Sequence, residues 1–171
     1  MHLRQRARWL ATWLAIGIAV AACATVEPSP EPSRSPSPVQ ASPNPKLVEF
    51  EGRVADALGR EGQLVRDLGA ASAGTNGQLR LVAGQLGEWA AGELSWLREH
   101  DADPCYEAAL AAYSKGLNAI GLAAGMFTML ASASAPPSDA DAQLAGQSLS
   151  DGTTSLEQAA TLAREARVDC T

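Results

Sequence analysis

Apolar residues recur at intervals of three to four along the chain from residue 47 to its end, which is the spacing of one buried face of an α-helix. Breaks in this pattern coincide with turn residues, namely Gly74 with the Asn76-Gly77 pair and, later, Pro136-Pro137. The pattern predicts four helices, over about 47–71, 78–100, 104–133 and 139–170. No alternating pattern typical of a strand competes with it.

Seven-residue repeats run through the last three of these segments and predict how the helices pack. The repeats are Val82, Trp89 and Trp96; Tyr106, Tyr113, Ile120 and Phe127; and Leu149, Leu156, Ala163 and Cys170. Such spacing with short connections is typical of left-handed bundles. We therefore expect an all-α fold, a single antiparallel up-down-up-down four-helix bundle over residues 47–171.

The segment before the bundle has a different composition. Seven of the 20 residues from Glu27 to Lys46 are proline and five are serine. So little apolar surface cannot offset chain entropy, which predicts a disordered stalk over residues 23–46. Proline favours extended conformations, so the 20 residues would reach up to ~60 Å at ~3.1 Å per residue. A proline-rich ligand for a partner domain is the alternative interpretation of this segment.

The N-terminus has the three-part plan of a secretory signal. Arg4, Arg6 and Arg8 are followed by an uncharged, mostly apolar stretch from Trp9 to Ala22, and then by Cys23. The last four residues, Val20-Ala21-Ala22-Cys23, resemble the lipobox of bacterial lipoproteins. An uncleaved membrane anchor and an ordinary cleaved signal are the alternatives, because the uncharged run is almost long enough to span a bilayer.

The lipoprotein resemblance covers residues 1–23 only and implies a location. Residues 1–22 would be a signal peptide that is removed, and Cys23 would carry diacylglycerol and a fatty acid such as palmitate. The chain would then be extracytoplasmic and anchored by lipid to the cell membrane or the outer membrane. Val20 stands where leucine is commonest in the motif.

Charge narrows the choice of partners for the remaining chain. The formal charge is −6, and removal of residues 1–22, which hold three arginines and no acid, makes it −9. Without a basic cluster, this balance argues against nucleic acid and against anionic membrane surfaces as partners.

Two cysteines, Cys105 and Cys170, remain beside Cys23. An isolated pair outside the cytoplasm is most simply a disulfide, and in an up-down bundle the start of the third helix lies beside the end of the fourth. Free thiols and a metal site are the alternatives, although a metal site needs two more ligands and His100 is the only histidine after the signal.

Several other residues suggest sites. Trp89 and Trp96 share a helix face, so we expect them either to pack in the core or, with Tyr113 and Phe127, to form a ligand or partner surface. Glu61 and Glu93 lie near core-facing positions and are interpreted as glutamates at the rim of the core. Glycines within the predicted helices suggest helices in close approach. The members of this set are Gly59, Gly62, Gly69, Gly84, Gly87, Gly92, Gly116, Gly121 and Gly125.

Metal and catalytic chemistry receive little support. Asp101, Asp103 and Asp169 should gather near His100, but their spacing does not fit a calcium-binding loop, and capping explains the first two. We find no serine–histidine arrangement, no phosphate-binding glycine loop and no Glu-x-x-His motif. The chain is therefore interpreted as a non-enzymatic domain without cofactor that binds a protein or cell-envelope partner. A bundle that binds a small apolar ligand is the alternative.

Overall fold

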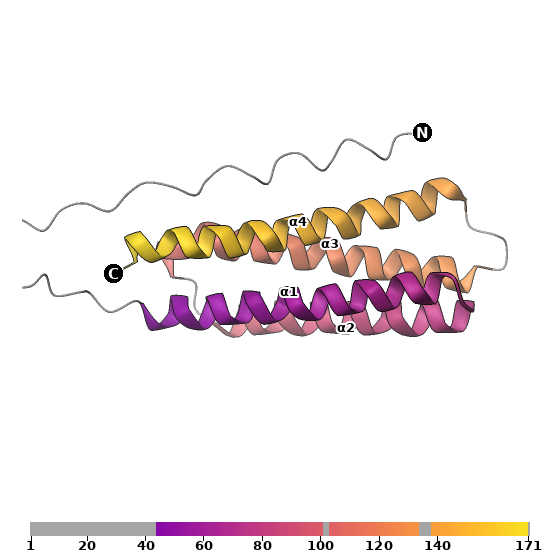
Figure 1. The fold of residues 1–171 in the computed structure, drawn as a ribbon, viewed down its shortest axis with the longest axis horizontal. Coiled ribbons are helices and arrows are strands. Elements are labelled where there is room, and N and C mark those ends of the chain that lie inside the picture. The colour runs from indigo at the N-terminus through magenta and orange to yellow at the C-terminus, as the bar shows by residue number, and fades with distance from the viewer. Residues whose placement is uncertain (1–43, 101–102, 134–137, 171) are drawn as a thin grey trace, which may run out of the picture. The chain divides into compact units, whose positions relative to one another are not determined.

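A computed structural model describes residues 44–100, 103–133 and 138–170 of the 171. Four α-helices make up nearly all of this part: α1 (Pro45–Ser72), α2 (Asn76–Glu99), α3 (Glu107–Ser132) and α4 (Asp139–Asp169), with a short 3-10 helix, η1 (Pro104–Tyr106), before α3. The described ranges contain no strand, so the all-α prediction is confirmed (Figure 1).

Helix starts follow the capping residues in the sequence. The Thr75 side chain accepts a hydrogen bond from the Gln78 backbone, and the Gln78 side chain reciprocates at the Thr75 backbone, so α2 begins two residues earlier than predicted. The Asp103 side chain caps η1, as expected, and the Ser138 side chain caps α4. Asn44 caps α1 ahead of Pro45, which suits a first helical position.

Contacts between residues of neighbouring helices show the relative directions of these helices. Glu51 and Glu61 of α1 contact Arg167 and Thr153 of α4, so residue numbers rise along one helix as they fall along the other. The disulfide likewise joins Cys105, just before the start of α3, to Cys170, just after the end of α4, so these two helices are also antiparallel. Figure 1 shows the four helices lying side by side, each reversing the direction of the one before.

Large apolar side chains from every helix fill the centre of the bundle. Tyr113, Leu117 and Ile120 of α3 have no exposed surface. The other large, fully buried side chains are Phe50, Leu47, Leu64, Leu86, Leu156 and Val54. The predicted seven-residue repeat therefore marks the buried face of α3 correctly as far as Ile120, whereas Phe127 is only half-buried.

The contact between α3 and α4 is the most extensive in the bundle, followed by that between α2 and α3. Gly116 and Gly152 lie against each other: a Cβ added at Gly152 would lie 3.0 Å from the Gly116 carbonyl oxygen and 2.6 Å from Cγ1 of Ile120. Close approach was expected from the glycines, and it is realised here. By contrast, Gly59, Gly121 and Gly125 would meet nothing within 4 Å, so these glycines mark no close contact within the chain.

A disulfide joins Cys105 in η1 to Cys170 at the end of α4, with their Cα atoms 5.7 Å apart. This supports the predicted pairing and ties the two most extensively packed helices together at one end. We call this end, where α1 also begins, the disulfide end.

The predictions for residues 1–43 lie outside the described residues. They include the signal peptide, the lipid attachment at Cys23 and most of the stalk. In the part of the chain that the structure does describe, no helix is long and apolar enough to cross a membrane.

Candidate functional site

A buried polar network connects α1, α2 and α3 near the disulfide end. One carboxylate oxygen of Glu93, Oε2, accepts a hydrogen bond from Nε of Arg53 at 2.7 Å and another from the Tyr113 hydroxyl at 2.8 Å. Glu93 is 9% exposed and Tyr113 is fully buried. Charge-assisted hydrogen bonds of this kind fix the relative positions of three helices.

This network perturbs the pKa values of both donors. Burial, followed by the hydrogen bond to Glu93, raises the pKa of the Tyr113 hydroxyl far above its ordinary value. The hydrogen bond to Glu93 also raises the pKa of Arg53, against the opposing effect of its partial burial. Tyr113 therefore remains a neutral donor and Arg53 a cation over the whole physiological pH range.

The second glutamate, Glu61, is buried as well. It is 4% exposed, and its Oε1 atom accepts a hydrogen bond from the Thr153 hydroxyl of α4 at 2.6 Å. The interpretation of Glu61 and Glu93 as rim residues is therefore wrong. Both carboxylates lie inside the bundle because groups on other helices donate hydrogen bonds to them, a cation and a hydroxyl at Glu93 and a hydroxyl at Glu61. The spacing along their own helices cannot show these partners.

An open groove lies between α2 and α3 near the disulfide end and encloses about 650 Å³. Its apolar lining comes from Leu94, Leu97 and Leu110. Polar or small side chains complete it: Arg98, His100, Glu107, Ala111, Ser114 and Asn118. An apolar strip between charged and amide groups is the composition expected of a protein-binding surface.

A smaller pocket of about 100 Å³ adjoins this groove, since His100 and Leu110 line both. Its walls include the aromatic rings of Phe50, Trp96 and Tyr106. The His100 ring stacks on Trp96 with centroids 4.1 Å apart, and Nδ1 of His100 lies 2.8 Å from the Trp96 carbonyl oxygen. Because a carbonyl only accepts, Nδ1 carries the proton.

The guanidinium of Arg53 also touches this aromatic cluster. Its Cζ atom lies 5.0 Å from the Trp96 ring centroid, within cation–π range. Arg53 thus links the buried Glu93 to the half-exposed Trp96. Neither Arg53 nor Phe50 could be recognised as a site residue from the sequence, because their importance depends on partners in other helices.

The four aromatic residues proposed as one surface occupy different environments. Tyr113 packs edge-on against Phe50, with centroids 5.6 Å apart, and its hydroxyl is engaged by Glu93. Trp96 lines the small pocket. Trp89 and Phe127 are half-buried and pack against the core.

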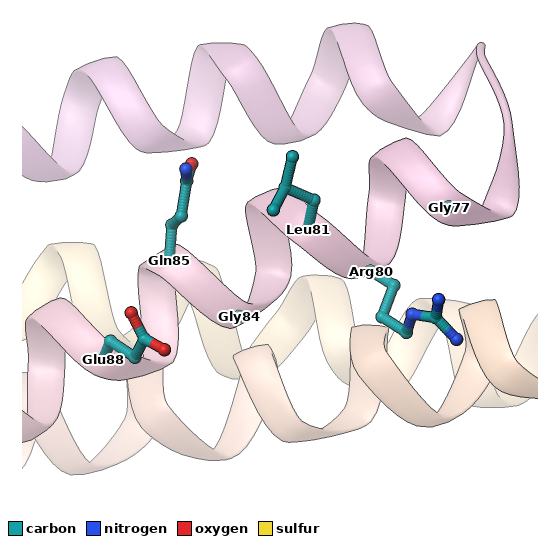
Figure 2. A pocket seen from close by; sticks show the side chains of 6 residues that line it. All are labelled: Gly77, Arg80, Leu81, Gly84, Gln85 and Glu88. Carbon is teal, nitrogen blue, oxygen red and sulfur yellow. The ribbon is translucent and has the colours of Figure 1, made fainter.

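A third hollow, of about 550 Å³, lies on the outer surface of α2 near its start. Gly77 and Gly84 leave space there between the longer side chains. In Figure 2, Leu81 and Gln85 extend on one side of α2 and Arg80 on the other, with Leu81 63% exposed. A single helix lines this hollow, whereas the α2–α3 groove takes its lining from two helices, so we regard the groove as the better candidate.

The acidic residues expected near the disulfide end do not form a metal site in the part of the chain that the structure describes. Asp103 accepts hydrogen bonds from the Cys105 backbone at 3.0 Å and from Nδ2 of Asn44 at 3.1 Å, and these two bonds, in that order, lower the pKa of its carboxyl. Asp101 lies outside the described residues. Within the described ranges, no three His, Cys, Asp or Glu side chains are grouped so as to hold a metal ion.

The groove and its neighbouring pocket therefore offer a surface for binding, made of an apolar strip, an aromatic pocket and charges of both signs. Comparison with known proteins adds no assignment. No protein-family model, curated protein or solved structure matches this chain.

Proposed function

We propose that this chain is a lipid-anchored, extracytoplasmic lipoprotein whose helical domain binds a protein or cell-envelope partner and performs no catalysis. The observation that carries the proposal is the Val20-Ala21-Ala22-Cys23 segment, which follows a basic and then an apolar stretch as in a lipoprotein signal. In this proposal Cys23 bears the lipid, and residues 24–43 connect it to the bundle.

This connection joins the bundle at the disulfide end. Asn44 precedes α1 and donates a hydrogen bond to Asp103 beside the disulfide, so the chain from the anchor enters at this end. A proline-rich segment of 20 residues, extended at ~3.1 Å per residue, would hold the bundle up to ~60 Å from the lipid surface. Such a spacer suits a domain that meets partners at some distance from its membrane.

The α2–α3 groove is the surface we assign to the partner. Its openness to solvent and its apolar strip with polar edges suit a helical or extended segment of another protein. Arg98 and Glu107 at its sides offer charges of both signs, which would select the orientation of a bound segment.

The competing proposal, a bundle that binds a small apolar molecule, receives less support. The enclosed aromatic pocket measures about 100 Å³, whereas ligand pockets usually measure about 300–1,000 Å³. The hydroxyl of Tyr113, one of its candidate residues, already donates to Glu93.

Metabolic labelling tests the anchor. Cells expressing the full chain are grown with an alkyne-bearing palmitate analogue, and the protein is captured and probed for the label. We expect label on the unsubstituted chain, none on Cys23→Ala, and retention of the former in washed membranes. A labelled Cys23→Ala variant, or an unlabelled parent, would refute the anchor.

Pull-down with a matched pair of variants tests the groove. Ala111 is exposed and lines the groove, whereas Ala55 is exposed on α1 and does not. We expect Ala111→Arg to lose proteins that the parent recovers from native membranes, and Ala55→Arg to retain them. Equal recovery by the two variants would remove the groove from the proposal.

A further inference from the structure

The three asparagines of the chain differ in the residue that follows them. Asn44 precedes a proline, Asn76 precedes Gly77 and Asn118 precedes an alanine. An asparagine is converted to aspartate when the backbone nitrogen of the next residue attacks its side-chain amide. Glycine in the next position favours this attack, because it has no side chain to hinder the nitrogen and its backbone adopts many conformations. The sequence therefore marks Asn76 as the asparagine most open to the reaction.

The structure leaves the pair Asn76 and Gly77 accessible at the start of α2. Both residues are exposed, and they occupy the first two helical positions after the cap Thr75. Their backbone N–H groups have no intrahelical partner, because the first bond of α2 runs from the Leu79 N–H to the Thr75 carbonyl. The Thr75 side chain accepts from the Gln78 N–H. The attacking nitrogen therefore lacks the hydrogen bond that holds such a nitrogen inside a helix.

The other two asparagines are in settings that oppose the same reaction. The nitrogen of the proline after Asn44 carries no hydrogen, and the Asn44 side chain is bonded to Asp103. Asn118 lies in the middle of α3, where the next backbone nitrogen is bonded along the helix, and its side chain donates to the Ser114 carbonyl at 2.8 Å. The chain thus contains two internal controls for Asn76.

We propose that Asn76 is a site of spontaneous deamidation, which converts it to aspartate and isoaspartate in the folded chain. The Gly77 nitrogen loses its proton to a base in solution and bonds to Cγ of Asn76. The bond from Cγ to Nδ2 breaks, and ammonia leaves with a proton taken from the solvent. One water molecule then opens the cyclic imide. Opening at Cγ gives aspartate, whereas opening at the backbone carbonyl gives isoaspartate, and no oxidant or reductant takes part.

The two products have opposite effects on the start of α2. A carboxylate in the first turn of a helix interacts favourably with the helix dipole, and exposed Arg80 lies four residues on, at the spacing of a stabilising ion pair. Gly77 and Arg80 both line the hollow on α2, so the new charge appears next to this hollow (Figure 2). Isoaspartate instead lengthens the backbone between Thr75 and Gln78 by one carbon, which disturbs their reciprocal cap.

Mass spectrometry of peptides tests the site. The folded full chain is incubated in mildly alkaline buffer, and the peptides that hold Asn76 and Asn118 are followed for the mass change from amide to carboxylate. We expect Asn76 to convert at least about tenfold faster than Asn118, which corresponds to ~1.4 kcal/mol in activation free energy. Mildly acidic buffer should slow the conversion, because the attacking nitrogen must first lose a proton.

Gly77→Ala is the variant that tests the mechanism. A Cβ at Gly77 would meet only Oγ1 of Thr75, at 3.8 Å, so this variant should keep the fold. We expect it to convert Asn76 about tenfold more slowly than the parent. Gly84→Ala, which raises the helix propensity of α2 equally and meets nothing within 4 Å, should convert at the parent rate. Equal rates in the parent and Gly77→Ala, or conversion of Asn118 as fast as that of Asn76, would overturn the proposal.

Discussion

Helices α3 and α4 are held together differently from α1 and its neighbours. Between α3 and α4, glycine meets glycine at Gly116 and Gly152, and a disulfide closes one end. Helix α1 instead contributes large side chains such as Phe50 and Leu64 to the core and makes its specific contacts through polar groups. The contacts of α1 with α2 and with α4 are far less extensive than that between α3 and α4.

The difference shows two ways of fixing a helix in a bundle. Small residues let the backbones of two helices come into direct contact. This contact consists of many weak van der Waals interactions and allows only one relative position of the two helices. Larger side chains hold helices further apart, so register must come from directed bonds such as Arg53 with Glu93 and Thr153 with Glu61. Helix α1 depends on such directed bonds. It is also the helix that follows the N-terminal segment.

The largest expected effect is loss of the disulfide on the α3–α4 side. Cys105 and Cys170 are 65 residues apart, and closing a loop of that length is worth about 4 kcal/mol in the chain-entropy model. Urea unfolding of Cys105→Ser with Cys170→Ser should show a free energy of unfolding lower by that amount. Reduction of the parent should reproduce the loss, and a loss below ~1 kcal/mol would contradict the account.

The next effect concerns the glycine contact. Gly152→Ala places a methyl group against the Gly116 carbonyl and Ile120, and overpacking of this kind costs about 3 kcal/mol. Gly59→Ala, at an exposed glycine with nothing within 4 Å, should instead gain up to ~1 kcal/mol in helix propensity. Thermal or urea unfolding of the two variants measures this, and shifts of the same sign would show that Gly152 is not a packing residue.

On the α1 side, Arg53→Met removes one donor from the buried carboxylate of Glu93. We expect a loss of about 2 kcal/mol, since a hydrogen bond to a charged group is lost and its acceptor stays buried. Addition of Glu93→Gln should recover more than half of that loss, because the uncompensated charge disappears. If the double variant is no more stable than Arg53→Met alone, charge compensation is not what Arg53 supplies.

The smallest effect is a pH dependence at Tyr113. Its pKa in the folded chain is raised above the ordinary 10.0 by burial and by the bond to Glu93. The unfolded chain therefore loses this proton from about pH 10, while the folded chain keeps it, so stability falls as the pH rises above 10. Tyr113→Phe should cost about 1 kcal/mol at pH 7 and weaken that alkaline decline. Urea unfolding between pH 7 and 11 measures both, and an unchanged decline would refute the assignment.

Much of the fold could be predicted from local pattern. Periodicity defined four helices, and the cap at Asp103 acts as expected because capping depends on residues within one turn. The pairing of Cys105 with Cys170 also followed, since connection length in a four-helix bundle determines which helix ends meet.

The candidate site could not be predicted to the same extent. Spacing placed Glu93 near the core, but its burial depends on Arg53 and Tyr113, which belong to other helices. Likewise Gly116 and Gly125 look alike in the sequence, yet one is packed against Gly152 and the other faces outward. The alignment of each helix with its neighbours distinguishes a packed glycine from an exposed one. Periodicity within a single helix does not give this alignment.

Hydrogen exchange of backbone amides tests the central comparison most directly. Exchange is followed by mass spectrometry in the parent chain, comparing peptides from the middle of α1 with peptides from α3 and α4. We predict that α1 opens at a free energy at least ~2 kcal/mol below that of α3 and α4, which exchange only on global unfolding. Equal protection of α1 and the α3–α4 pair would show that the polar contacts hold α1 as firmly as the glycine contact and the disulfide hold the pair, and would contradict the account.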